Sequence, residues 1–184
     1  MTCIAALVDG GRVWMGGDSA GVSGLDLTVR SDAKVFSLGL GRDRLVIGYT
    51  TSFRMGQLLR FGFEPPPLPA YDDWLLRYMV VDFVEAVRTR LKAGGFTETA
   101  NGRETAGHFL VGVRGRLFSV ESDFQVAEAA DGYDAVGCGA AYAKGSLHTT
   151  AGLDLPAQRR LTLALEAAER HSAGVRGPFE ILHA

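Results

Sequence analysis

Short apolar runs alternate with turn-forming residues in the first part of the chain. Two such runs, at 2–8 and 12–16, are separated by Asp9-Gly10-Gly11. Asp-Gly and Gly-Gly are typical of tight hairpins because glycine adopts positive φ without strain. Two further runs, at 33–38 and 44–49, predict a second hairpin, which we expect in the same sheet as the first.

Apolar positions three and four residues apart predict helices further along. The clearest helix begins at Asp72-Asp73 and ends before Gly94-Gly95. Its expected buried stripe is Leu76, Met79, Val80, Phe83, Val87 and Leu91. Two more helices are predicted at 50–61 and 140–149.

The last predicted helix follows Asp154 and Pro156, which suit an N-cap and a first turn. Its apolar stripe is Leu161, Ala164, Leu165 and Ala168. A closing strand is expected at 178–182.

The remaining apolar runs predict a second set of strands. They lie at 108–113, 117–120, 124–128 and 133–136. Three connecting segments contain no strong pattern: 20–32, with one short strand at 27–29; 62–71, extended because it is rich in proline; and 96–107, an exposed loop.

The order is strands, two helices, strands, two helices and a strand. This order is not the βαβ alternation of a parallel sheet, so it favours an α+β fold of two antiparallel sheets, each covered by helices. No linker or fixed-period repeat divides the chain, and we expect a single domain over residues 1–184.

Composition narrows the classes of partner and cofactor. A formal charge of −2 gives no electrostatic reason to expect nucleic acid or an anionic membrane. No apolar run has the length of a membrane span, and no basic segment precedes the first strand as in a signal peptide, so we expect a cytoplasmic protein. Two cysteines exclude a paired-cysteine zinc site, and His108, His148 and His183 lack ligand spacing, so neither metal nor cofactor is expected.

Candidate chemistry begins at Thr2. If Met1 is removed, Thr2 carries a hydroxyl and a free α-amine on one residue, a nucleophile and a base already in place. The alternative is a purely structural role for Thr2, as an ordinary threonine of the first strand. The first hairpin returns the chain toward its start, so Asp18 is expected near Thr2.

Thr2, Asp18 and Lys34 are equally spaced along the chain. Further motifs accompany them: Gly16-Gly17 before Asp18, Ile47-Gly48 at the end of a strand, Val136-Gly137-Cys138-Gly139 before a helix, and a final helix–strand unit. With these motifs the sequence resembles the proteasome β-subunit and its bacterial relative HslV, which are N-terminal-threonine hydrolases. The resemblance spans nearly the whole chain and implies a four-layer αββα sandwich.

The resemblance also implies roles for single residues. Thr2 is expected to be the nucleophile and its own amine the base, while Lys34 supplies a fixed positive charge. Asp18 is expected to orient Lys34 and keep it charged, and Gly48 to offer its backbone N–H to an oxyanion. Each has a structural alternative: a surface lysine, a turn aspartate and a strand-end glycine.

Three positions depart from the family pattern. Cys138 stands where the family has a serine near the nucleophile, and a thiol is a weaker hydrogen-bonding group. His171 and Gly174 stand where the family has an aspartate and a serine, and Ser172 is a possible substitute. Cys138 is equally consistent with a small buried residue.

The resemblance predicts a threonine-type endopeptidase that acts on peptides or proteins through an acyl-enzyme. It further implies a homo-oligomeric ring and leaves an ATPase partner open. Two alternatives remain: a non-catalytic ring or scaffold subunit that keeps the fold, and an amidohydrolase of the same superfamily acting on small molecules.

Overall fold

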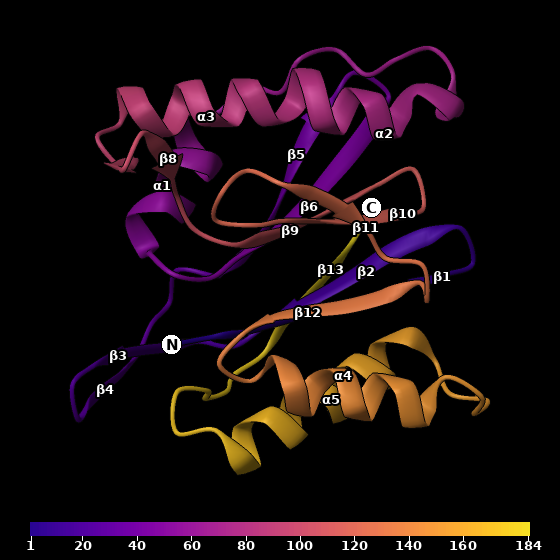
Figure 1. Cartoon of the computed structure of the whole chain (residues 1–184). Coiled ribbons are helices and arrows are strands. Elements are labelled where there is room, and N and C mark those ends of the chain that lie inside the picture. The colour runs from indigo at the N-terminus through magenta and orange to yellow at the C-terminus, as the bar shows by residue number, and fades with distance from the viewer.

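The four-stranded sheet carries the N-terminus. The computed structural model describes residues 1–184 and orders the strands of this sheet as β12 (Tyr133–Gly137), β1 (Cys3–Asp9), β2 (Arg12–Gly17) and β13 (Glu180–His183), all antiparallel (Figure 1). Gly10 and Gly11 have φ of 56° and 74°, and glycine adopts such positive φ values without strain, so the first hairpin turns at the predicted residues. The predicted hairpin and closing strand are confirmed.

The second sheet has five antiparallel strands. Their order is β11 (Val126–Glu128), β10 (Arg116–Val120), β9 (Phe109–Val113), β6 (Asp43–Tyr49) and β5 (Val35–Leu40). The expectation that both early hairpins share one sheet is wrong. The two edges of the β1–β2 hairpin are taken by β12 and β13, which come from the C-terminal half, so β5–β6 pairs with β9 instead.

Helices cover the outer face of each sheet (Figure 1). The helices α1 (Phe53–Gly62), α2 (Leu75–Tyr78) and α3 (Val84–Ala93) pack on the five-stranded sheet, and α4 (Ala140–Thr150) and α5 (Ala157–His171) pack on the four-stranded sheet. A third apolar cluster, which includes Ile4, Met15 and Val46, fills the space between the sheets. The predicted four-layer αββα sandwich is therefore confirmed. None of its helices has the length and apolar character needed to cross a membrane.

The long helix of the second layer is not uniform. A 3-10 turn at Asp72–Trp74 leads into α2, and a π-helical segment at Met79–Phe83 joins α2 to α3. Leu76 and Val80 of the expected stripe are exposed, at 41% and 46%. The buried positions are Leu75, Tyr78, Met79, Phe83, Val84, Val87 and Leu91. Several of these buried positions are four residues apart. In a regular helix of 3.6 residues per turn, such positions would move gradually around the helix surface, and the wider π turn brings them back to the buried face.

The last helix has the predicted stripe but not the predicted cap. Leu161, Ala164, Leu165 and Ala168 are all buried. Pro156, not Asp154, occupies the N-cap position, and no side chain caps the helix.

Two small hairpins were underpredicted. The segment expected as a loop with one strand contains β3 (Ala20–Ser23) and β4 (Asp26–Val29), and the loop expected at 96–107 contains β7 (Glu98–Ala100) and β8 (Arg103–Thr105). Both are largely exposed, so no apolar alternation marked them. The turn between β7 and β8 is Asn101-Gly102, with φ of 50° and 77°, which is a recognised hairpin signal that outweighed the polarity of its flanks.

Candidate active site

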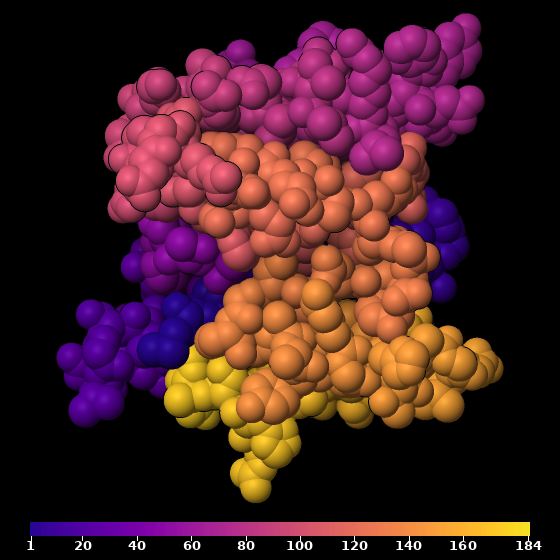
Figure 2. All heavy atoms as spheres, in the orientation of Figure 1, coloured from indigo at the N-terminus to yellow at the C-terminus, as the bar shows by residue number.

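Thr2 lies at the end of the sandwich, just before β1, and is 4% exposed. Its backbone faces β12, because its N–H donates to Cys138 Sγ at 3.3 Å and its carbonyl accepts from Gly139 N at 3.3 Å. Side chains alternate along β1: Cys3 packs with the α4–α5 layer and Ile4 packs between the sheets. The side chain of Thr2 therefore lies on the inter-sheet side. In Figure 2 the N-terminal residues reach the surface beside the β3–β4 segment and the C-terminal segment.

The hairpin register delivers Asp18 to the same place. Ile4 pairs with Gly17, so Asp18, the residue that follows β2, lies beside the start of β1. The Asp18 carboxylate accepts from the N–H groups of Cys3 and Ala20, both at 2.9 Å, and of Arg176 at 3.3 Å. These three backbone donors hold the carboxylate in a fixed position. The contact from Arg176, in the loop before β13, could not be inferred from sequence spacing.

Lys34 completes a buried ion pair with Asp18. Its Nζ is 2.8 Å from Asp18 Oδ1, and the exposed fractions of the two side chains are 1% and 0%. The same Nζ donates to Met1 O at 3.4 Å, which places the ammonium next to the Met1–Thr2 peptide. Burial lowers the pKa of Lys34 below its ordinary value of 10.5, and the charge and hydrogen bond of Asp18 oppose that effect.

Met1 occupies part of the site. Its carbonyl accepts a 2.5 Å hydrogen bond from Thr2 Oγ1 and the longer one from Lys34. With Met1 in place, the nitrogen of Thr2 belongs to a peptide bond and cannot act as a base. Gly174 makes room for this residue, since a Cβ on Gly174 would lie 2.3 Å from Met1 Cβ.

Cys138 contacts Thr2 from the other side. Its Sγ accepts from Thr2 N and from Ser172 Oγ, each at 3.3 Å, and donates to Thr2 O at 3.4 Å. The residue is exposed rather than buried. The structure thus links Thr2, Cys138 and Ser172 in one chain of hydrogen bonds, which was foreseen for Ser172 only as a possibility.

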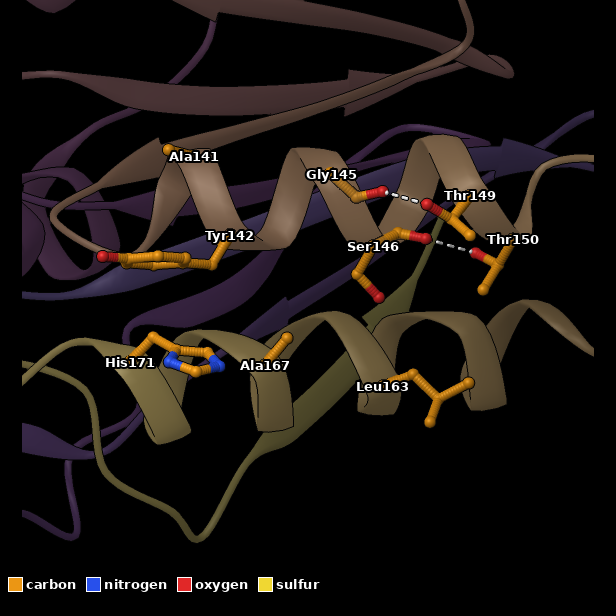
Figure 3. A pocket seen from close by; sticks show the side chains of 9 residues that line it. All are labelled: Ala141, Tyr142, Gly145, Ser146, Thr149, Thr150, Leu163, Ala167 and His171. Carbon is orange, nitrogen blue, oxygen red and sulfur yellow. Dashed lines mark hydrogen bonds between the residues drawn. The ribbon is translucent and has the colours of Figure 1, made fainter.

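His171 points elsewhere. Its ring lies against Tyr142, with centroids 5.5 Å apart, in a cavity of about 570 Å³ between α4 and α5 (Figure 3). The rest of the lining is small, apolar or hydroxyl-bearing, and it contains none of the residues predicted for the site. The cavity therefore belongs to the outer face of the helical layer and not to the Thr2 centre.

Gly48 lies in β6 at the level of the site. A Cβ on Gly48 would lie 2.5 Å from Ile4 Cγ2, so a glycine here permits close approach of the sheets. Tyr49 N donates to the carbonyl preceding β5, and Thr50 N donates to the carbonyl preceding β9. Backbone N–H groups alternate in direction along a strand, so Gly48 N–H points toward its β9 partner Leu110. The structure does not bring this donor to Thr2.

Cys3 is separated from this centre although it follows Thr2 directly. It is fully buried in the α4–α5 layer, and burial raises its pKa to about 12. A thiol held neutral in this way is a poor nucleophile. The neighbouring thiol that reaches Thr2 is Cys138, from the other end of the sequence.

Two antiparallel sheets therefore lie between two helical layers, and the N-terminus lies beside a buried lysine–aspartate pair. No protein-family model matches the chain, and no curated protein matches its sequence. Solved structures do match it along its length.

The BPH protein of Thiobacillus denitrificans in complex with epoxomicin aligns with a TM-score of 0.77 at 18% identity, over 100% of this chain and 98% of that one. Eukaryotic HslV from Trypanosoma brucei aligns with a TM-score of 0.70 at 18% identity, over 99% and 98%. Anbu from Pseudomonas aeruginosa, solved as a helical assembly, aligns with a TM-score of 0.68 at 18% identity, over 100% and 81%. The chain therefore has the HslV-like, proteasome-like fold that the sequence resemblance predicted.

Proposed function

We propose that this chain is a threonine-type endopeptidase whose nucleophile is Thr2 after removal of Met1. The observation that carries the proposal is the buried Asp18–Lys34 pair, with the Lys34 ammonium directed at the Met1–Thr2 peptide. A buried charge pair is costly, and one placed beside an N-terminal threonine has a clear electrostatic use.

In the proposed reaction, Thr2 Oγ adds to the substrate carbonyl while the α-amine of Thr2 takes the hydroxyl proton. A free α-amine has a pKa of about 7.7–8.0, which suits this transfer near neutral pH. The Lys34 ammonium favours the neutral amine and stabilises the charge that develops. The C–N bond then breaks, the leaving amine takes the proton, and water hydrolyses the resulting ester with the same amine as base.

Cys138 and Ser172 would orient the amine, since Cys138 Sγ is 3.3 Å from both Thr2 N and Ser172 Oγ. Asp18 would hold Lys34 in place. The similarity to HslV and to an epoxomicin-bound protein supports peptides as the substrate class. We further propose one domain over residues 1–184, located in the cytoplasm and working as a homo-oligomer. Anbu's solved helical assembly is in keeping with an oligomer, and a closed ring is the form we favour.

The test combines intact mass with turnover. Purified protein should begin at Thr2, hydrolyse fluorogenic peptides and gain one molecule of a peptide epoxyketone such as epoxomicin. Thr2→Ala should neither hydrolyse the peptides nor react with the epoxyketone. Cys3→Ala, whose side chain lies in the opposite layer, should still hydrolyse the peptides and react with the epoxyketone. Active protein that retains Met1 in full would overturn the N-terminal-nucleophile mechanism. Activity on small amides but not on peptides would identify an amidohydrolase.

The structure also supports a second candidate, a non-catalytic assembly subunit that keeps Met1. The Met1 carbonyl already receives two hydrogen bonds, and the space above Gly174 accommodates its side chain. N-terminal sequencing separates the two, because the scaffold begins with Met1 and shows no turnover.

A further inference from the structure

Thr50 has a hydroxyl that makes no hydrogen bond within the chain. It follows β6 directly and is 7% exposed. Its backbone N–H donates to His108 O, but its side chain takes part in no hydrogen bond. A hydroxyl with no partner in the protein keeps its O–H donor available to a bound group.

The strand pattern directs this hydroxyl toward Thr2. Val46 packs between the two sheets, and Gly48 contacts Ile4 across the same gap. Alternation along β6 therefore puts the side chain of Thr50 on this inner face, two residues beyond Gly48 at the end of the sandwich. Thr2 lies two residues before Ile4 on the facing strand, so the two threonines lie opposite each other.

A contact at Gly137 supports this placement. A Cβ added to Gly137 would lie 2.2 Å from Thr2 O and 3.2 Å from Thr50 Oγ1. The two oxygens therefore border the same glycine, which has a φ of 100° and precedes Cys138. Three segments that are distant in sequence thus converge on the nucleophile: the N-terminus, the end of β6 and the end of β12.

The end of β6 also differs from what the resemblance implied. Gly48 N–H points along the sheet toward β9 and is not available at Thr2. Thr51, next to Thr50, has a φ of 74°, and its N–H makes no hydrogen bond. The donors left free at this end of the strand are the Thr50 hydroxyl and the Thr51 N–H.

We propose that the Thr50 hydroxyl donates a hydrogen bond to the oxyanion formed when Thr2 Oγ adds to the substrate carbonyl, in the role expected for the Gly48 N–H. This inference rests on the proposed function. The carbonyl π electrons move to oxygen as the Thr2 O–C bond forms, and they return when the C–N bond breaks. Thr50 keeps its proton throughout. Its β-branch limits χ1, so the donor is oriented before substrate binds.

Three variants test the inference. Thr50→Val keeps the shape and removes the hydroxyl, Thr50→Ser returns the hydroxyl, and Thr162→Val removes an exposed α5 hydroxyl that bonds Gln158 O. Thr50→Val should lower kcat about 10²–10³-fold with little change in KM, the range for losing one oxyanion donor. Affinity for a peptide aldehyde, whose hemiacetal oxygen resembles the oxyanion, should fall in parallel. Thr50→Ser should recover most of both, and Thr162→Val should match wild type.

The outcomes separate this inference from the function beneath it. Wild-type kcat and aldehyde affinity in a folded Thr50→Val protein would overturn the role of Thr50 alone and leave Thr2 as the nucleophile. An equal loss in Thr50→Val and Thr50→Ser would also overturn it, because the hydroxyl would then not be the group that matters. Wild-type protein that neither turns over peptide nor reacts with an epoxyketone would end both proposals.

Discussion

Two hairpins meet at the site, and they end there in different ways. The β1–β2 hairpin delivers Asp18, whose carboxylate receives three backbone N–H groups and the Lys34 ammonium. The β5–β6 hairpin starts after Lys34 and ends at Thr50, whose hydroxyl is unpaired. At the end of the β1–β2 hairpin the Asp18 carboxylate is fully hydrogen-bonded, whereas at the end of the β5–β6 hairpin the Thr50 hydroxyl has no partner. Saturated groups hold a charge in place, and groups held unpaired remain available to a ligand.

The largest expected effect comes from breaking the saturated end. Asp18→Ala leaves the Lys34 ammonium buried without its partner and deprives three N–H groups of their acceptor. We expect a loss of about 3–5 kcal/mol in the free energy of unfolding, the range for removing one member of a buried ion pair. Urea denaturation measures it, with Asp26→Ala on the exposed strand β4 as control. A loss similar to that of the control would contradict the view that Asp18 organises this end.

Removing the other partner should separate activity from stability. In Lys34→Met the Asp18 carboxylate keeps its three N–H donors, so the loss of stability should be smaller than for Asp18→Ala. Turnover should nevertheless fall at least about 10²-fold, because the charge beside Thr2 is gone. Lys34→Arg should not restore it, since the planar guanidinium cannot replace a compact ammonium. Peptide kinetics and denaturation of the same preparations decide the point.

The dependence of kcat/KM on pH should report the protonation of both the Thr2 amine and Lys34. kcat/KM should rise as the Thr2 amine loses its proton and fall as Lys34 loses its own, and burial places this second limb below pH 10.5. Asp18→Asn should move the alkaline limb to lower pH, because Asp18 raises the pKa of Lys34. An alkaline limb at or above pH 10.5 in wild type, or an upward shift in the variant, would show that Lys34 is not the group observed.

Stability should show the same titration. The unfolded chain keeps the Lys34 proton to higher pH than the folded protein does. The free energy of unfolding should therefore rise with pH between the lowered pKa of Lys34 and 10.5. Below that window, the destabilisation caused by burying the protonated Lys34 should be present in full.

The smallest effects are expected at the two cysteines. Cys138→Ser replaces the thiol with a hydroxyl that bonds Thr2 N and Ser172 at least as well, so activity should stay within about threefold or improve. Cys3→Ala should cost about 1 kcal/mol of stability and little activity, because Cys3 packs in the opposite layer. Alkylation by iodoacetamide near pH 8, read by mass, should modify Cys138 and spare Cys3, whose pKa is about 12. Preferential labelling of Cys3 would contradict this placement.

Local patterns were sufficient where neighbours in sequence are neighbours in space. Asp9-Gly10-Gly11 closed the first hairpin, and that hairpin alone carried Asp18 back to the start of β1. The buried stripe of α5 was also predicted correctly from the sequence, because its spacing matches a regular helix that covers one sheet. The stripe of the long helix was misread at Leu76 and Val80, since a π segment is set by packing against the sheet and has no simple sequence signal.

The amino-acid sequence by itself determined the antiparallel class, the four-layer order and the presence of a threonine, an aspartate and a lysine in the family's positions. The antiparallel class and the layer order follow from periodicity and turn chemistry, which act over a few residues, whereas the three residues were identified through the family resemblance. Only the tertiary structure decided that β5–β6 joins the other sheet, that Cys138 and Ser172 reach Thr2 and that His171 does not. It also decided that Gly48 N–H faces β9 while the Thr50 hydroxyl stays free. Such contacts depend on strand register and on the packing of two sheets, which bring together residues far apart in the chain.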